Sequence, residues 1–141
     1  MTQKSALFKN LPSPTIGNMM EVMKLEIFPP NDIIIKIGSE IGEVYFISSG
    51  AVAIMTSDGK ELCHLADGEE FGTNCLFFQK RKYAVVGIET TEVFIIDKNQ
   101  LIEFLHLYPD VINGFYRSIK QKLAKLKNLE ECATTTSQFN F

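Results

Sequence analysis

The fold of this chain is decided by residues 28–86, which read FPPNDIIIKIGSEIGEVYFISSGAVAIMTSDGKELCHLADGEEFGTNCLFFQKRKYAVV. Short runs of β-branched and aromatic residues are each followed by Gly, Asn or Asp, a pattern typical of strands joined by tight turns. The runs recur about every eight to twelve residues, which favours a small antiparallel β-roll or jelly-roll-like barrel over alternating strands and helices. We therefore expect a β-roll over residues 26–97, with a hairpin turn at Asp58-Gly59.

The segments on either side of the β-roll have the period of amphipathic helices. Before it, apolar residues recur at steps of about three to four and predict a helix over residues 13–25. After it, two C-terminal helices are expected within residues 98–129, and Pro109 ends the first of them. The predicted fold class is α+β, an antiparallel β-roll with a flanking N-terminal helix and C-terminal helices.

Length and composition fit one globular domain. The chain has 141 residues, of which 45% are hydrophobic, and this is ample for a single core. We expect the domain to span residues 6–129, after a disordered N-terminus at 1–5 and before a flexible tail at 130–141.

Charge and hydropathy argue against several classes of function. The formal net charge is −3, whereas a nucleic-acid-binding surface needs a clear excess of Lys and Arg. No apolar run reaches the roughly 18 residues of a spanning helix, and the N-terminus lacks the apolar core of a secretion signal. The three cysteines are spaced irregularly and predict reduced thiols. These features indicate a soluble, cytoplasmic protein with no nucleic-acid partner and no direct membrane insertion.

Residues 71–86 allow two interpretations. Phe71 and Gly72 precede two small polar residues, an apolar group and three cations at 80–82. Main-chain N–H groups after a glycine, followed by Arg or Lys, can hold a phosphate without a metal ion. The alternative is a β-hairpin with an exposed basic tip that binds nothing.

Two features of the sequence are found together in a known family. One is the order of a helix, a series of short strands and further helices, and the other is an FG turn followed by cations. On these features residues 6–129 resemble the cyclic nucleotide-binding domain. The likeness is greatest to the cytoplasmic domains of hyperpolarization-activated and cyclic-nucleotide-gated cation channels, through the IG..YFI..G.V segment at residues 41–52 and the L..YP helix end. The resemblance implies a domain that binds cAMP or cGMP and needs no other cofactor.

The resemblance also implies two groups of ligand-binding residues. In the family, the segment after the FG turn binds the cyclic phosphate, while apolar strand positions and a C-terminal lid helix enclose the base. The implied phosphate-binding cassette comprises Phe71, Gly72, Thr73, Asn74, Cys75, Arg81, Lys82, Tyr83 and Ala84. The implied base pocket and lid comprise Met55, Cys63, Leu65, Lys122 and Leu126.

Three cassette residues depart from the family pattern. Thr73 stands where the family has a glutamate for the ribose hydroxyl, and the loss of a charge-assisted bond would cost about 1–2 kcal/mol. Lys82 stands at the position of a phosphate-binding arginine and lacks the bidentate fork, which neighbouring Arg81 could supply instead. Tyr83 replaces a small Thr or Ser and could crowd or fill the pocket.

These departures leave two functions open. In the first, the domain binds cyclic nucleotide, moves its C-terminal helix and gates a cation channel. Its partner would be the remainder of a parent membrane protein, which in such channels can be a tetramer. In the second, it is a homology domain like that of ether-à-go-go-type potassium channels, which binds no nucleotide. It would then regulate through an intrinsic or empty pocket and through contacts between domains.

Two further classes fit the sequence less well. A cupin-type enzyme has a jelly roll, but its metal needs several histidines and this chain has only His64 and His106. No Ser, Cys or His stands with a carboxylate in a recognisable catalytic pattern, so we predict a non-enzyme without catalytic or metal-binding residues. A bacterial-type transcription regulator would need a DNA-binding helix-turn-helix, for which the chain is too short and too acidic.

Overall fold

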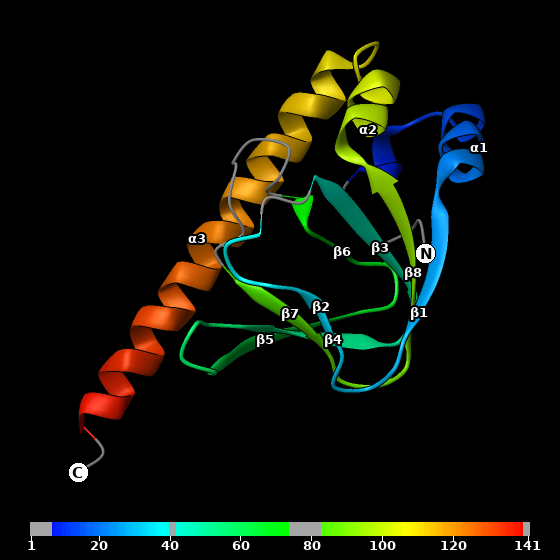
Figure 1. The fold of residues 1–141 in the computed structure, drawn as a ribbon. Helices are drawn as coiled ribbons and strands as arrows, with labels where there is room; N and C mark the ends of the chain where they lie inside the picture. Colours follow the sequence, from blue (N-terminus) through cyan, green and yellow to red (C-terminus); the bar gives the residue numbers. More distant parts are fainter. Residues whose placement is uncertain (1–6, 40–41, 74–82, 140–141) are drawn as a thin grey trace.

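The computed structural model describes residues 7–39, 42–73 and 83–139 of the chain (Figure 1). In chain order the elements are η1 (Phe8–Asn10), α1 (Ser13–Val22), β1 (Lys24–Phe28), β2 (Ile33–Ile35), β3 (Glu43–Ser49), β4 (Ala51–Met55), β5 (Glu61–Ala66), β6 (Glu70–Phe71), β7 (Ala84–Gly87), β8 (Thr91–Asp97), α2 (Lys98–Leu105) and α3 (Pro109–Phe139). The N-terminus at 1–5, predicted to be disordered, lies outside the described residues. Within them, no helix has both the length and the apolar character needed to cross a membrane.

The strands form two antiparallel sheets, ordered β1-β8-β3-β6 and β2-β7-β4-β5. The most extensive pairing joins β3 to β8 and begins with Glu43 opposite Asp97. The predicted antiparallel β-roll with flanking helices is therefore confirmed. In the described residues the two sheets are separate, because β1 and β6 end one sheet and β2 and β5 end the other, so the roll is not a closed barrel.

Strand β3 supplies side chains to two hydrophobic cores, because successive residues of a strand point to opposite faces. Tyr45 packs between the two sheets, where its ring stacks on Phe71 with centroids 4.8 Å apart. Val44 and Phe46 point to the other face and pack against η1, α1, α2 and α3. Since full burial of such side chains contributes roughly 1.5–3 kcal/mol each, β3 ties the roll to the helices.

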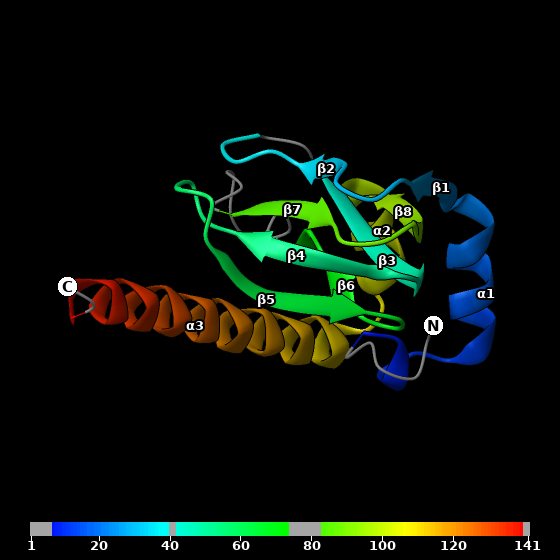
Figure 2. The same ribbon diagram turned by 90° about the horizontal axis from the view of Figure 1, so that it is seen from below.

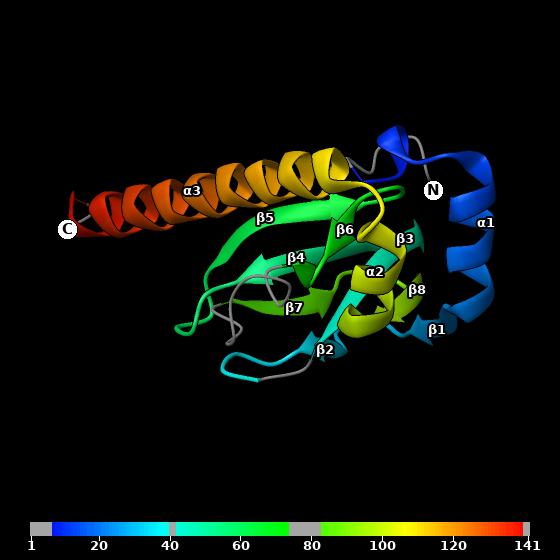
Figure 3. The same cartoon turned by 90° about the horizontal axis from the view of Figure 1, so that it is seen from above.

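The helices differ in length from the sequence prediction. Helix α1 ends at Val22 rather than at residue 25, because Lys24 already pairs with Ile95 of β8. Helix α3 continues to Phe139, through residues predicted to form a flexible tail. No Gly or Pro follows Gly114, so the sequence offers α3 no strong backbone signal to end earlier. Figures 2 and 3 show α3 running alongside β5 and extending beyond the roll.

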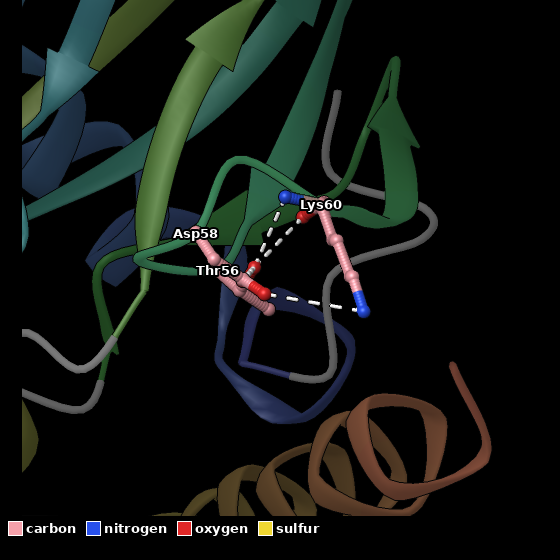
Figure 4. Close-up of polar contacts among 3 residues, drawn as sticks. All are labelled: Thr56, Asp58 and Lys60. Atoms are coloured by element: carbon pink, nitrogen blue, oxygen red, sulfur yellow. Dashed lines mark hydrogen bonds and ion pairs between the residues drawn. The ribbon is translucent and has the colours of Figure 1, made fainter. Parts of the chain in front are cut away.

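The hairpin between β4 and β5 confirms the turn predicted at Asp58-Gly59. Gly59 has a φ of 82°, which a glycine adopts without steric cost. In Figure 4, Thr56 Oγ1 donates to the Asp58 carboxylate and accepts a hydrogen bond from Lys60 N at 3.0 Å. Lys60 Nζ lies 3.9 Å from Asp58 Oδ2. These contacts stabilise the turn that leads into β5, the strand beside α3.

Candidate functional site

A pocket of about 250 Å³ lies between the β-roll and α3. One wall comes from β2, β4, β5, β6 and β7 and from the residues after β6, and the opposite wall comes from α3. Helix α3 is held in this position because Phe115 and Ile119, near its start, are buried in the core shared with α1 and α2. The volume is slightly below the roughly 300 Å³ at which small-molecule pockets usually begin.

Apolar side chains form much of the pocket wall. Ile54, Tyr83 and Leu126 make a small buried cluster that joins β4 and the start of β7 to α3. Cys63 and Leu65 of β5 pack against this cluster. Burial raises the pKa of the Cys63 thiol, so this side chain stays neutral and apolar at physiological pH. A wall of this kind suits the face of a planar aromatic ligand.

The chain turns at Gly72 as it leaves β6. Gly72 has a φ of 79°, in the left-handed region that favours glycine, and Thr73 after it is buried and lines the pocket. The structure therefore places the opening of the predicted cassette at the pocket. The other polar and charged members of the cassette, together with Cys75, lie outside the described residues: Asn74, Cys75, Arg81 and Lys82.

A buried carboxylate stands directly before this turn. Glu70 lies opposite Phe46 in the β3–β6 pairing, and its side chain is only 1% exposed. Lys122 Nζ, from α3, donates to Glu70 Oε1 at 3.1 Å. The second oxygen of Glu70, Oε2, is buried and has no hydrogen-bond partner among the residues that the structure describes. The Glu70–Lys122 pair is thus a polar link between the roll and the helix at the pocket wall.

Tyr83 makes a second polar link between the roll and α3. Its ring is buried in the pocket wall, and its hydroxyl donates to Glu130 Oε2 at 3.2 Å. Burial, assisted by the neighbouring Glu130 carboxylate, raises the pKa of Tyr83 to about 12. The ring therefore occupies space beside the pocket as a neutral phenol that contacts the helix.

The pocket brings together most of the described residues that the sequence predicts for the site. Those that line it are Phe71, Gly72, Thr73, Tyr83, Cys63, Leu65, Lys122 and Leu126. Met55 and Ala84 do not belong to the lining and pair with each other across β4 and β7. The neighbouring pair, Ile54 and Val85, lines the pocket instead. Residues 52–55 are all apolar, so the sequence does not reveal which of them face inward.

Sequence reasoning missed the two carboxylates that hold α3. Glu70 is one of two adjacent glutamates in front of Phe71, and its burial depends on the pairing of β6 with β3. Glu130 falls in the segment that the sequence assigns to a tail. Neither has a local signal, because both contacts join residues about fifty positions apart: Glu70 to Lys122, and Tyr83 to Glu130.

The fold and pocket define a β-roll domain whose cavity is walled on one side by a C-terminal helix. Among solved structures, the Thermus thermophilus catabolite activator protein superposes with a TM-score of 0.74 and 20% identity, covering 92% of this chain and 63% of that chain. The N-terminal domain of a transcriptional regulator from Streptomyces coelicolor A3(2) gives a TM-score of 0.68 at 19% identity, covering 90% of this chain and 92% of that domain. These likenesses support the fold.

Sequence comparison gives the family. The model described as "Cyclic nucleotide-binding domain" matches residues 25–108. The potassium/sodium hyperpolarization-activated cyclic nucleotide-gated channel 2 of Mus musculus is 33% identical over 110 residues, 77% of this chain, and channel 4 of Oryctolagus cuniculus gives the same identity and coverage. The chain spans 13% and 9% of the lengths of these two proteins. It belongs to the cyclic nucleotide-binding domain family.

Proposed function

We propose that this domain is a regulatory, non-catalytic sensor that binds a cyclic nucleotide, cAMP or cGMP, between the β-roll and α3. The observation that carries the proposal is the pocket itself, since its wall combines the turn at Gly72 and Thr73 with residues of α3. A ligand that contacts both walls can bias the position of the helix through its stronger contacts with one arrangement. Binding would thereby be coupled to movement of α3.

The chemistry of the pocket supports a ligand with a planar base and a phosphate. The apolar cluster of Ile54 and Leu126, with Leu65 beside it, would contact the base. The phosphate would lie at the segment that begins with Thr73, near the cations that the sequence places at Arg81 and Lys82.

The relatives suggest a setting for such a sensor. Two of them are named as cyclic nucleotide-gated channels, and this chain covers only a small share of each. The proposed parent is therefore a cation channel in which the domain is an intracellular part, with α3 passing the signal to the remainder of the protein. In this setting, the parent would be a tetramer.

A second candidate function is a homology domain that binds no nucleotide. Tyr83 favours it, because its ring lies in the pocket wall and is joined to Glu130 of α3 by a hydrogen bond. In that case Tyr83 would act as an intrinsic occupant that holds the helix against the roll. Regulation would then depend on contacts between domains.

Isothermal titration calorimetry with cAMP and cGMP separates the two candidates, with the non-cyclic nucleotide AMP as the control ligand. The sensor predicts saturable binding of a cyclic nucleotide by the wild-type chain, and tighter binding after Thr73→Glu with Lys82→Arg. The homology domain predicts no heat at millimolar ligand, with binding gained only in Tyr83→Thr. Absence of binding in the wild type would overturn the sensor proposal.

A further inference from the structure

Glu70 carries an unpaired acceptor in the wall of the pocket. Its side chain is 1% exposed, and Oε2 is the only buried side-chain nitrogen or oxygen without a hydrogen-bond partner in the described part of the chain. Leaving one oxygen of a buried carboxylate unpaired is costly, because the group has lost its hydration without replacement. A donor that reached Oε2 would therefore be bound strongly.

Two other polar groups of the pocket wall have partners within the protein. Glu69 Oε1 accepts from Ala66 N at 3.2 Å, and the Tyr83 hydroxyl donates to Glu130. Glu70 differs because only Oε1 is engaged, by Lys122 Nζ at 3.1 Å. The two oxygens of this carboxylate thus differ: Lys122 of α3 engages Oε1, and Oε2 has no partner in the described part of the chain.

We infer that Glu70 is a specificity-determining residue whose Oε2 accepts a hydrogen bond from an uncharged donor group of the ligand. This inference rests on the proposed function and names the residue that selects the ligand. The donor is a sugar hydroxyl or the amino group of a base, since both provide an uncharged hydrogen-bond donor. Ligands that lack this donor would leave Oε2 unpaired in the complex.

The negative charge of Glu70 excludes the phosphate of the ligand from this position. A phosphate placed beside a buried carboxylate would be repelled by its negative charge. Glu70 is also two residues from Gly72, which at the rise of a strand is at most about 7 Å along the chain. A phosphate near Thr73 would accordingly bring the attached sugar, rather than the more distant base, next to Glu70.

The test compares three ligands by calorimetry on the 141-residue chain: cAMP, its 2′-deoxy analogue and the analogue without the base amino group. We expect the wild type to bind cAMP about tenfold or more tightly than one of the analogues, as for a lost hydrogen bond to a charged group. The weaker analogue identifies the donor. In Glu70→Gln the ratio of the affinity for cAMP to the affinity for the weaker analogue should fall to a few-fold or less.

Glu21→Gln is the control, because Glu21 is an exposed carboxylate on α1 that does not belong to the pocket lining. It should keep the wild-type ratio. Equal binding of all three ligands by the wild type, or an undiminished ratio in Glu70→Gln, would overturn the inference while the proposed function stands. Failure of the wild type to bind cAMP, either analogue or cGMP would instead overturn the proposed function, and this inference with it. The comparison of ligands on the wild type needs no variant to fold.

Discussion

Tyr83 is the residue whose ionisation reports on the contact between the roll and α3. Burial and the Glu130 carboxylate raise its pKa from about 10 to about 12, so the folded protein favours the neutral phenol. A group whose pKa rises on folding adds stability below its unfolded pKa. That stability is lost as the pH rises through the folded value.

The Tyr83→Phe variant tests this pH dependence, because it keeps the ring and removes the ionisable hydroxyl. Below pH 10 it should be less stable than the wild type by about 0.5–1.5 kcal/mol, the usual net value of a hydrogen bond. Between about pH 10 and pH 12 the free energy of unfolding of the wild type should fall relative to the variant. Urea denaturation measures both, and parallel pH profiles would contradict the assignment.

At the scale of elements, Gly50 controls the connection between β3 and β4. It has a φ of 111°, and a Cβ at this position would lie 2.7 Å from Thr90 O and 2.7 Å from Thr91 Cα. Because the contacted atoms belong to the main chain of a neighbouring segment, they cannot move aside easily. We expect Gly50→Ala to lower the free energy of unfolding by about 1–3 kcal/mol.

Gly17→Ala is the control for that experiment. Gly17 lies in α1, and a Cβ there would meet no atom within 4 Å. Since alanine is the better helix former, this change should stabilise the protein by about 0.5–1 kcal/mol. Urea denaturation of both variants gives the comparison, and a Gly50→Ala protein as stable as the wild type would show that the connection tolerates a side chain.

Helix α3 is held over the pocket by Leu126, which is buried with Ile54 and Tyr83. Leu126→Ala should weaken this contact by about 2 kcal/mol, the lower end for a buried leucine, because the site is at the edge of the core. Amide hydrogen exchange should accelerate in the second half of α3 and remain unchanged in β3 and β8. Exposed Lys127→Ala is the matched control. Uniform acceleration across the molecule would mean that α3 does not open separately.

At the scale of the whole molecule, the sequence predicts the order of the elements well. The turn at Asp58-Gly59 and the β-roll between helices follow from local chemistry, because glycine positions and β-branched runs act within a few residues. The family resemblance is confirmed by the match over residues 25–108. Most of the described pocket residues implied by that resemblance do line one pocket.

The features that the sequence does not predict depend on distant pairing. Ile54 rather than Met55 faces the pocket because of the register between β4 and β7, and an all-apolar run gives no alternation from which to infer it. Glu70 becomes buried through its position opposite Phe46 and beneath Lys122 of α3. Such contacts arise only when the fold is complete, so local pattern cannot reveal them.

The central claim is that a cyclic nucleotide binds between the β-roll and α3. Titration of the isotope-labelled chain with cAMP and with cGMP, followed by two-dimensional amide NMR, tests binding and location together. We predict saturable shifts at Thr73, Tyr83 and Leu126, on both walls of the pocket, with little change in β1. Spectra that stay unchanged at millimolar nucleotide, or shifts confined to residues away from α3, would contradict the account.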